Sequence, residues 1–282
     1  MDVRAYLLER TPLVDEALER ALPAAADPPA ELHAAMRHLV FPGGKRLRPV
    51  LSLAAAEAVG APPGRALPFA AAVELVHTYS LVHDDLPCMD DDAERRGRPS
   101  VHVAYGEASA VLAGDALLAL AFEVLATAPT AEAVLPAQRL AALTELARAA
   151  GSRELVGGQS DDLSLASGRA DAELIESIHL RKTAALIAAA IAGGALLGGA
   201  SAQEVNALRR FGLAVGVAFQ IADDVLDADE EEDSSLVALL GLDAAQARAE
   251  EFLAEALAAL EDFGERAEPL RALARFSLRR TE

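Results

Sequence analysis

Two clusters of aspartates are the residues in this sequence best suited to chemistry. The first cluster contains Asp84, Asp85 and Asp90, and the second contains Asp223, Asp224 and Asp227. Carboxylates that share a helix face repel one another unless a cation lies between them. Carboxylate oxygens are suitable ligands for Mg²⁺, which proteins usually hold with one or two carboxylates and the phosphates of a substrate. The clusters therefore predict a magnesium diphosphate site, with two solvated helix ends as the alternative.

Lysine usage points to the groups that would bind the phosphates. The chain has 25 Lys and Arg residues, and only Lys45 and Lys182 are lysines. Lys45 follows Gly43 and Gly44 at an expected helix start, and Arg48 lies three residues later, on the same helical face. Such a pair would form a diphosphate clamp. The alternative, a basic helix start on the surface, is opposed by the helix dipole.

Further basic residues stand near the acidic clusters. Arg95 and Arg96 follow the first cluster directly, which suggests a phosphate shared by these cations and a carboxylate-bound metal. Lys182 and Thr183 open an apolar helix, where the lysine either binds a phosphate or extends its charge into solvent. No Ser/His/Asp or Cys/His set demands a protein nucleophile, and no Cys/His cluster has the spacing of a zinc site.

Helices must position these residues, because the composition favours little else. Hydrophobic residues make up 52% of the 282 residues and aromatic residues only 4%, and Ala and Leu are the best helix formers. We predict an all-α fold, a large helical bundle forming one domain over residues 1–282, with its site between facing helices. The predicted helices lie near residues 2–20, 29–40, 44–59, 65–85, 106–127, 131–150, 171–181, 183–198, 201–227, 243–263 and 267–280, and the pair Gly157 and Gly158 is read as a break.

Charge and hydropathy exclude several classes of protein. A formal net charge of −19 argues against nucleic acid as a partner. The single cysteine, Cys88, excludes an internal disulfide, and residues 1–20 lack the apolar core of a signal peptide, so a cytoplasmic location is expected. The longest apolar run, Ala184 to Ala200, contains four glycines and predicts a buried core helix, with no membrane span.

Seven motifs carry a resemblance to a known family. They are GGKRLRP (43–49), HTYSLVHDDLPCMDDD (77–92), RRGRPS (95–100), LAGDALL (112–118), GGQSDDL (157–163), HLRKTAALI (179–187) and AFQIADDVLD (218–227). In order and spacing they resemble the trans-isoprenyl diphosphate synthases, the polyprenyl synthetase family, and most of all its bacterial farnesyl diphosphate synthases. The resemblance covers nearly the whole chain. It implies an all-α homodimer of about ten or more helices per chain around a central cavity.

The resemblance also assigns roles to residues of this chain. It implies that isopentenyl diphosphate condenses with an allylic diphosphate by Mg²⁺-assisted ionisation, without a protein nucleophile. The metal ligands, for three Mg²⁺, would be Asp84, Asp85, Asp90, Asp223, Asp224 and Asp227. Isopentenyl diphosphate would bind Gly44, Lys45, Arg48, His77 and Arg96, while Arg95 and Lys182 would reach the allylic diphosphate. Thr183 and Gln220 would line the reacting centre, and Gln159 and Asp162 match cavity positions of the family.

Product length can be argued from helix geometry. Tyr79 and Ser80 lie five and four residues before Asp84, and one helical turn rises roughly 5.4 Å, about one isoprene unit. A tyrosine just over one turn from the metals would form a floor after a few units. Tyr79 and the spacing of the first cluster therefore favour a C15 product, farnesyl diphosphate. If Tyr79 is ordinary core, a deeper floor would give geranylgeranyl diphosphate, the C20 product.

The sequence departs from the family after the second cluster. Members usually carry lysines there that reach the allylic diphosphate, whereas no Lys or Arg occurs from Phe211 to Ala247. Residues 228–235 are instead mostly acidic and form a shorter segment. A solvated loop that spares the site is one interpretation. Weaker allylic binding, or a weakly active or regulatory homologue, is another. A terpene cyclase is disfavoured because the second cluster is all aspartate and an isopentenyl pocket is present.

Overall fold

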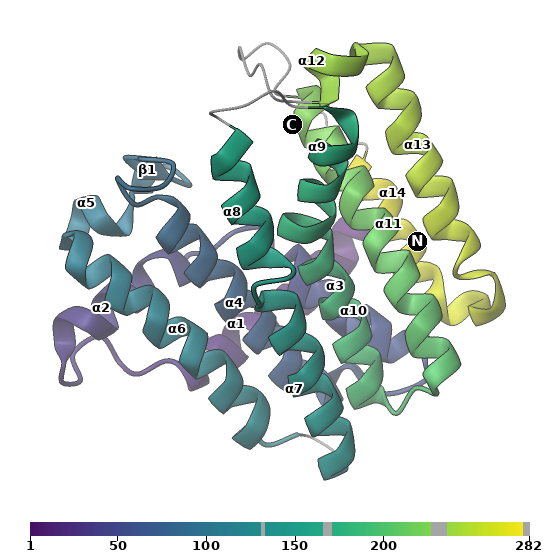
Figure 1. Ribbon diagram of the computed structural model, residues 1–282. Coiled ribbons are helices and arrows are strands. Elements are labelled where there is room, and N and C mark those ends of the chain that lie inside the picture. Colours follow the sequence, from purple (N-terminus) through teal and green to yellow (C-terminus); the bar gives the residue numbers. More distant parts are fainter. Residues whose placement is uncertain (131–132, 166–170, 227–235, 279–282) are drawn as a thin grey trace.

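The all-helical prediction is confirmed by the computed structural model, which describes residues 1–130, 133–165, 171–226 and 236–278 (Figure 1). The helices are α1 (Val3–Ala21), α2 (Ala30–Val40), α3 (Leu47–Ala58), α4 (Leu67–Asp84), α5 (Val101–Tyr105), α6 (Glu107–Thr127), α7 (Pro136–Ala150), α8 (Leu155–Leu165), α9 (Ala172–Ile178), α10 (Ala185–Gly198), α11 (Ala202–Leu226), α12 (Leu236–Leu240), α13 (Leu242–Ala258) and α14 (Glu268–Leu278). A two-residue hairpin, β1 (Glu94–Arg95) and β2 (Arg98–Pro99), pairs antiparallel.

Helix α10 forms the centre of the bundle. It packs against α3, α4, α7 and α11 (Figure 1), and nearly all of its side chains are buried. A helix that is apolar on every side is stable only where neighbours cover all of its faces. The predicted core helix is thereby confirmed. Within the described residues, two segments, Glu107–Thr127 and Ala172–Gly198, are long and apolar enough to cross a membrane, but 72% of the most apolar window of the second is buried inside the fold.

Helix α4 brings the first aspartate cluster to the rim of this core. Most of its residues are buried, and it packs along α6 and α3. The helix ends at Asp84, as predicted from Pro87, which disfavours a helical residue before it. Helix α11, which carries the second cluster, packs along α10 and α13. The buried helices thus bring two clusters that are far apart in sequence toward each other.

Three predicted boundaries were wrong. Helix α3 begins at Leu47, because Arg46 has a left-handed backbone with a φ of 51°, so Lys45 precedes the helix and does not share a face with Arg48. Helix α8 was not predicted, and it runs through Gly157 and Gly158. Between α9 and α10 the chain forms a π-helical turn, η2 (His179–Ala184), in place of two separate helices. Single-turn π-helices are rare and often mark functional sites.

Candidate active site

The first aspartate cluster starts at the C-terminus of α4, where the helix dipole favours a bound cation. The turn beyond it is closed by the amide of Asp90, which donates to the carbonyl of Asp84 over 2.9 Å. Burial, with smaller contributions from Asp90 and Asp85, raises the pKa of the Asp84 carboxyl to about 7, against the lowering effects of Lys182 and Arg95. Asp84 is therefore held where its negative charge needs a cation.

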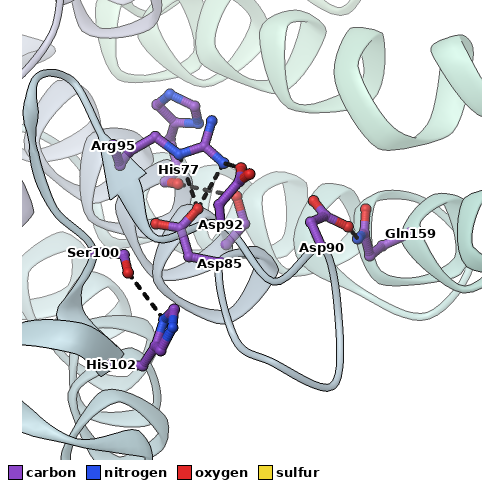
Figure 2. A network of polar contacts seen from close by, with 9 residues as sticks. His77, Asp85, Asp90, Asp92, Arg95, Ser100, His102 and Gln159 are labelled. Atoms are coloured by element: carbon purple, nitrogen blue, oxygen red, sulfur yellow. Dashed lines mark hydrogen bonds and ion pairs between the residues drawn. The ribbon is translucent and has the colours of Figure 1, made fainter. Parts of the chain in front are cut away.

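Asp85 and Asp90 have different surroundings (Figure 2). Asp85 is fully buried and accepts two hydrogen bonds from the Arg95 guanidinium, at 2.8 and 2.6 Å. Arg95 also contacts Asp92 at 2.5 Å. Asp90 is exposed on the turn, 3.5 Å from the side-chain amide of the buried Gln159 on α8. The structure thus makes Asp85 the anchor of Arg95 and directs Asp84 toward the cavity described below.

The second cluster is tied to η2 by side-chain contacts. The hydroxyl of Thr183 donates to Gln220 over 2.9 Å, and the Gln220 amide lies 3.4 Å from an Asp224 oxygen. The other Asp224 oxygen lies 3.4 Å from the amide of Leu236 and 3.5 Å from Nε2 of His179. Burial lowers the pKa of His179 to about 4. Asp223 lines the cavity, and Asp227 lies outside the described residues.

The π-helical turn η2 presents two cations to the carboxylates of α8. Lys182 contacts Asp162 at 2.5 Å, and Arg181 pairs with Asp161. This close approach needs a glycine, because a Cβ at Gly158 would lie 2.5 Å from the backbone nitrogen of Lys182. The glycine that was read as a helix break therefore allows α8 to hold the lysine in place.

The groups predicted to bind isopentenyl diphosphate lie where α3 meets α4, and we call Arg48 and His77 the isopentenyl clamp. Nη1 of Arg48 is 3.3 Å from Nε2 of His77, and Gly44 lies against the Arg96 guanidinium. Burial lowers the pKa of His77 well below its usual value, and the positive charges of Arg48, Arg96, Arg46 and Arg95 lower it further. A neutral histidine among arginines can donate to a phosphate without adding charge. Lys45 is exposed at the loop above this group.

Two adjoining cavities connect these parts. The first, of about 380 Å³, is lined by Arg48, His77, Ser80, Leu81, Asp84, Arg95, Leu155, Gln159, Lys182, Thr183, Leu186, Phe219, Gln220 and Asp223. The second, of about 310 Å³, is lined by Tyr79, Ser80, His83, Asp84, Met89, Leu155, Val156, Gln159, Ser160 and Leu163. They share four wall residues, so a charged chamber adjoins one that is mainly apolar. This is the arrangement needed for a charged head and a hydrocarbon tail.

Tyr79 forms part of the wall of the apolar chamber. Its ring meets the ring of His83 edge-on, with centroids 5.9 Å apart. Nε2 of His83 lies 3.0 Å from the carbonyl oxygen of Val111 on α6, and the ring also lies against Gly114, where a Cβ would be 2.1 Å away. Tyr79 is thus packed on a histidine that is itself anchored to α6.

The donor set fits Mg²⁺ better than a metal held by protein alone. In the described part of the chain, no three His, Cys, Asp or Glu side chains come together as a preformed metal site. Asp84 and Asp223 line one cavity beside Lys182 and Arg95. Mg²⁺ is commonly held by one or two carboxylates together with substrate phosphates, which is the geometry this cavity offers.

Most of the predicted site residues meet at this cavity. Asp84, Asp223, Arg48, His77, Arg95, Lys182, Thr183 and Gln220 line it together. Asp85 and Asp224 face protein partners, and Arg96, whose Nη1 lies 3.3 Å from the carbonyl oxygen of Leu39, stands with Gly44 at the neighbouring loop. Sequence reasoning gave no role to His179, Phe219 and Asp161, although each lies inside one of the seven motifs.

Comparisons with known proteins agree with this geometry. A family model described as polyprenyl synthetase matches residues 29–258. A relative named heterodimeric geranylgeranyl pyrophosphate synthase large subunit 1, from Arabidopsis thaliana, is 48% identical over 80% of this chain and 61% of its own length. Another, geranylgeranyl pyrophosphate synthase 7 of the same plant, is 43% identical over 99% of this chain and 84% of its own.

Solved structures share the fold over nearly the full chain. An FPP/GFPP synthase from Zymomonas mobilis has a TM-score of 0.89 and 38% identity, covering 98% of both chains. A geranyltransferase from Legionella pneumophila has a TM-score of 0.88 and 35% identity, covering 98% of this chain and 96% of that one. The predicted likeness to bacterial farnesyl-type enzymes is therefore found among structures, while these curated relatives are named for the C20 product.

Proposed function

The chain belongs to the polyprenyl synthetase family of trans-prenyltransferases, and we propose that it condenses isopentenyl diphosphate with an allylic diphosphate to form geranylgeranyl diphosphate. The observation that carries this proposal is the cavity in which Asp84 and Asp223 face Lys182 and Arg95. Two acidic and two basic groups around one chamber suit a metal-bound diphosphate leaving group.

The residues of the charged chamber divide the work. Arg48 and His77, with Lys45 and Arg96 beside them, hold the diphosphate of isopentenyl diphosphate. Asp84 and Asp223 would hold Mg²⁺, which when bound would neutralise charge on the allylic diphosphate as it leaves. Lys182 and Arg95 stabilise the negative charge that grows on the departing oxygen as the allylic C–O bond breaks. Leu186 and Phe219 line the same chamber and limit the access of water.

The reaction needs no covalent bond to the protein. The double bond of isopentenyl diphosphate attacks the allylic carbocation, a carbon–carbon bond forms, and one proton is lost to the released diphosphate. Thr183 and Gln220, which hydrogen-bond each other across the chamber wall, orient the reacting carbons. The growing chain then enters the apolar chamber between α4 and α8.

Product length is the finer part of the proposal. The two relatives described above, 48% and 43% identical to this chain, are named geranylgeranyl pyrophosphate synthases, and they support C20 over the C15 product expected from the sequence. Farnesyl diphosphate is the second candidate, because Tyr79 lines the apolar chamber five residues before Asp84 and structural relatives include an FPP/GFPP synthase.

Product analysis tests both parts. Purified protein is incubated with Mg²⁺, isopentenyl diphosphate and dimethylallyl, geranyl or farnesyl diphosphate, and the hydrolysed products are sized. Elongation of farnesyl diphosphate to C20 supports the leading proposal, whereas accumulation of C15 supports the second. Conversion of an allylic substrate without isopentenyl diphosphate would indicate a cyclase. Binding without turnover would indicate a regulatory subunit, the reading that the lysine-free stretch from Phe211 to Ala247 favours.

We also propose that the chain pairs with a second copy through α6. Val111 and Leu112 on this helix are 41% and 56% exposed, and only 39% of its most apolar window is buried. Apolar side chains on a long helix are stabilised by a partner that covers them. Replacing both residues with aspartate should convert a dimer to a monomer in light scattering; an unchanged mass would contradict the proposal.

A further inference from the structure

A fully buried arginine, Arg46, lies directly below the isopentenyl clamp. Its Nε donates to Asp15 on α1 over 2.8 Å, and Nη1 donates to Glu74 on α4 over 2.7 Å. Its Nη2 donates to the carbonyl of Val40 at the end of α2 over 2.6 Å. One guanidinium therefore joins three helices, and its side chain is 0% exposed.

Asp15, Arg46 and Glu74 form a largely buried charged triad, and such a group adds little net stability to a fold. Burying charges costs several kcal/mol per ion before pairing, so a buried ion pair is weak grounds for expecting a more stable fold. A planar guanidinium with fixed donors instead imposes orientation on the groups it binds. The arrangement of Asp15, Arg46 and Glu74 is therefore better explained by the geometry it holds than by the free energy of unfolding.

The triad holds the loop from Phe41 to Arg46, which contains no helix or strand. Arg46 has a φ of 51°, in the left-handed region. The guanidinium fills the space under Gly43, where a Cβ would lie 2.2 Å from Nη2. The loop is thus folded over the arginine side chain, and its next residues carry the clamp.

Both sides of the clamp depend on the triad. Arg48 lies two residues after Arg46, in the first turn of α3. His77 lies three residues after Glu74, so the two share a face of α4. The contact between Arg48 and His77, at 3.3 Å, therefore joins the same two elements that Arg46 and Glu74 join below it.

Charge gives the triad a second effect. In a chain with a net charge of −19, the groups that bind a diphosphate must stay positively charged, so Arg48 and Arg96 must not be neutralised by nearby carboxylates. Asp15 and Glu74 pair with Arg46 directly. This pairing allows an arginine to be buried beside Arg48 and Arg96 without leaving its charge uncompensated.

We propose that Asp15, Arg46 and Glu74 form a positioning triad that sets the affinity of the enzyme for isopentenyl diphosphate. The inference rests on the proposed function. Asp15 lies before residue 29, outside the segment that the polyprenyl synthetase model matches, so α1 contributes to the site through a residue beyond that match. None of the three lines the substrate cavity, and they act through Arg48, His77 and the loop.

Asp15→Asn is the most informative variant, because its side chain is 39% exposed and the replacement keeps its shape. We expect the KM for isopentenyl diphosphate to rise about tenfold, with the allylic KM and kcat changing less than about twofold. Glu57→Gln is the matched control. Glu57 joins α1 to α3 through Arg10 and Tyr6, but at the far end of α3 from Arg48, so both KM values should stay at wild-type levels.

Arg46→Lys and Glu74→Gln complete the series, each measured with its melting temperature. A selective rise in the isopentenyl KM in variants that keep a cooperative melt supports the triad. Equal rises in both KM values, or a rise in the control as large as in Asp15→Asn, would overturn it. If wild type does not condense the substrates, the proposed function fails. Calorimetric binding of isopentenyl diphosphate then decides the inference, which is wrong if Asp15→Asn binds as wild type or if wild type does not bind.

Discussion

The two aspartate clusters obtain their positive charge in different ways. The first cluster carries its own, because Arg95 follows ten residues after Asp85 and binds it directly. The second cluster lies on α11, and no Lys or Arg occurs from Phe211 to Ala247. The cations near it come from other elements: Lys182, on the π-helical turn, lines the cavity with Asp223 and also lowers the pKa of Asp84 in the first cluster. The first cluster therefore has an arginine of its own in addition to Lys182, whereas the second depends on cations that other elements bring to the cavity.

The comparison gives the first cluster the larger role in catalysis. Asp84→Asn should lower kcat about 1,000-fold, because Asp84 lines the cavity at a helix C-terminus that favours a cation. Steady-state kinetics at saturating Mg²⁺ measure the effect, and Asp262→Asn on the exposed turn before α14 is the control. A loss smaller than about tenfold would mean that the second cluster suffices.

The same variant should show an opposite effect on stability. The pKa of Asp84 is raised from 3.8 to about 7 in the folded protein, so the wild type binds a proton more tightly folded than unfolded. The contribution of Asp84 to stability is therefore fully present below about pH 4 and is lost as pH rises through about 7. Without Mg²⁺, Asp84→Asn should melt above wild type at pH 8, and the difference should shrink as pH falls from about 7 and disappear below about pH 4. Melting curves that shift in parallel at all pH values would contradict this sign.

Substitutions at two neighbouring residues test whether the second cluster depends on a cation from η2. Lys182 and Arg181 both pair with carboxylates of α8, but only Lys182 lines the cavity. Lys182→Met should lower kcat about 100-fold, the usual cost of removing one donor to developing charge. Arg181→Met is the matched control and should change kcat less than threefold or so. Equal losses would show that η2 matters only for folding.

Asp223 and Asp224 sharpen the comparison further. Asp223 lines the cavity, whereas Asp224 lies among Gln220, His179 and the amide of Leu236. Asp223→Asn should raise the Mg²⁺ concentration needed for half-maximal activity about tenfold more than Asp224→Asn does. Titration of Mg²⁺ at fixed substrate gives both values. The reverse order would mean that Asp224 is the ligand and Asp223 its support.

The sequence predicted the charged residues that line the cavity more completely than the residues that hold them in position. Asp84, Asp223 and Lys182 could be named because charge in or beside an apolar helix is unusual enough to be noticed. Arg48 was named from its spacing to Lys45, and His77 only from the family resemblance. The Arg46 anchor could not, because Asp15 and Glu74 are far from it in sequence and only the packing of three helices brings them together. Local patterns record which groups are present, and tertiary contacts decide which of them face the cavity.

Gly158 is another residue whose role depends on a tertiary contact that the local sequence does not show. Its substitution has the smallest predicted effect. It was read as a break, but it lies inside α8 and allows that helix to approach η2. Gly158→Ala would place a Cβ 2.5 Å from the backbone nitrogen of Lys182, although alanine is the better helix former by about 1 kcal/mol. We expect overpacking to win, with a net destabilisation of about 1–2 kcal/mol and a severalfold loss of kcat as Lys182 moves. Chemical denaturation and kinetics measure the two effects. A more stable variant with full activity would show that the borrowed lysine does not depend on close packing of α8.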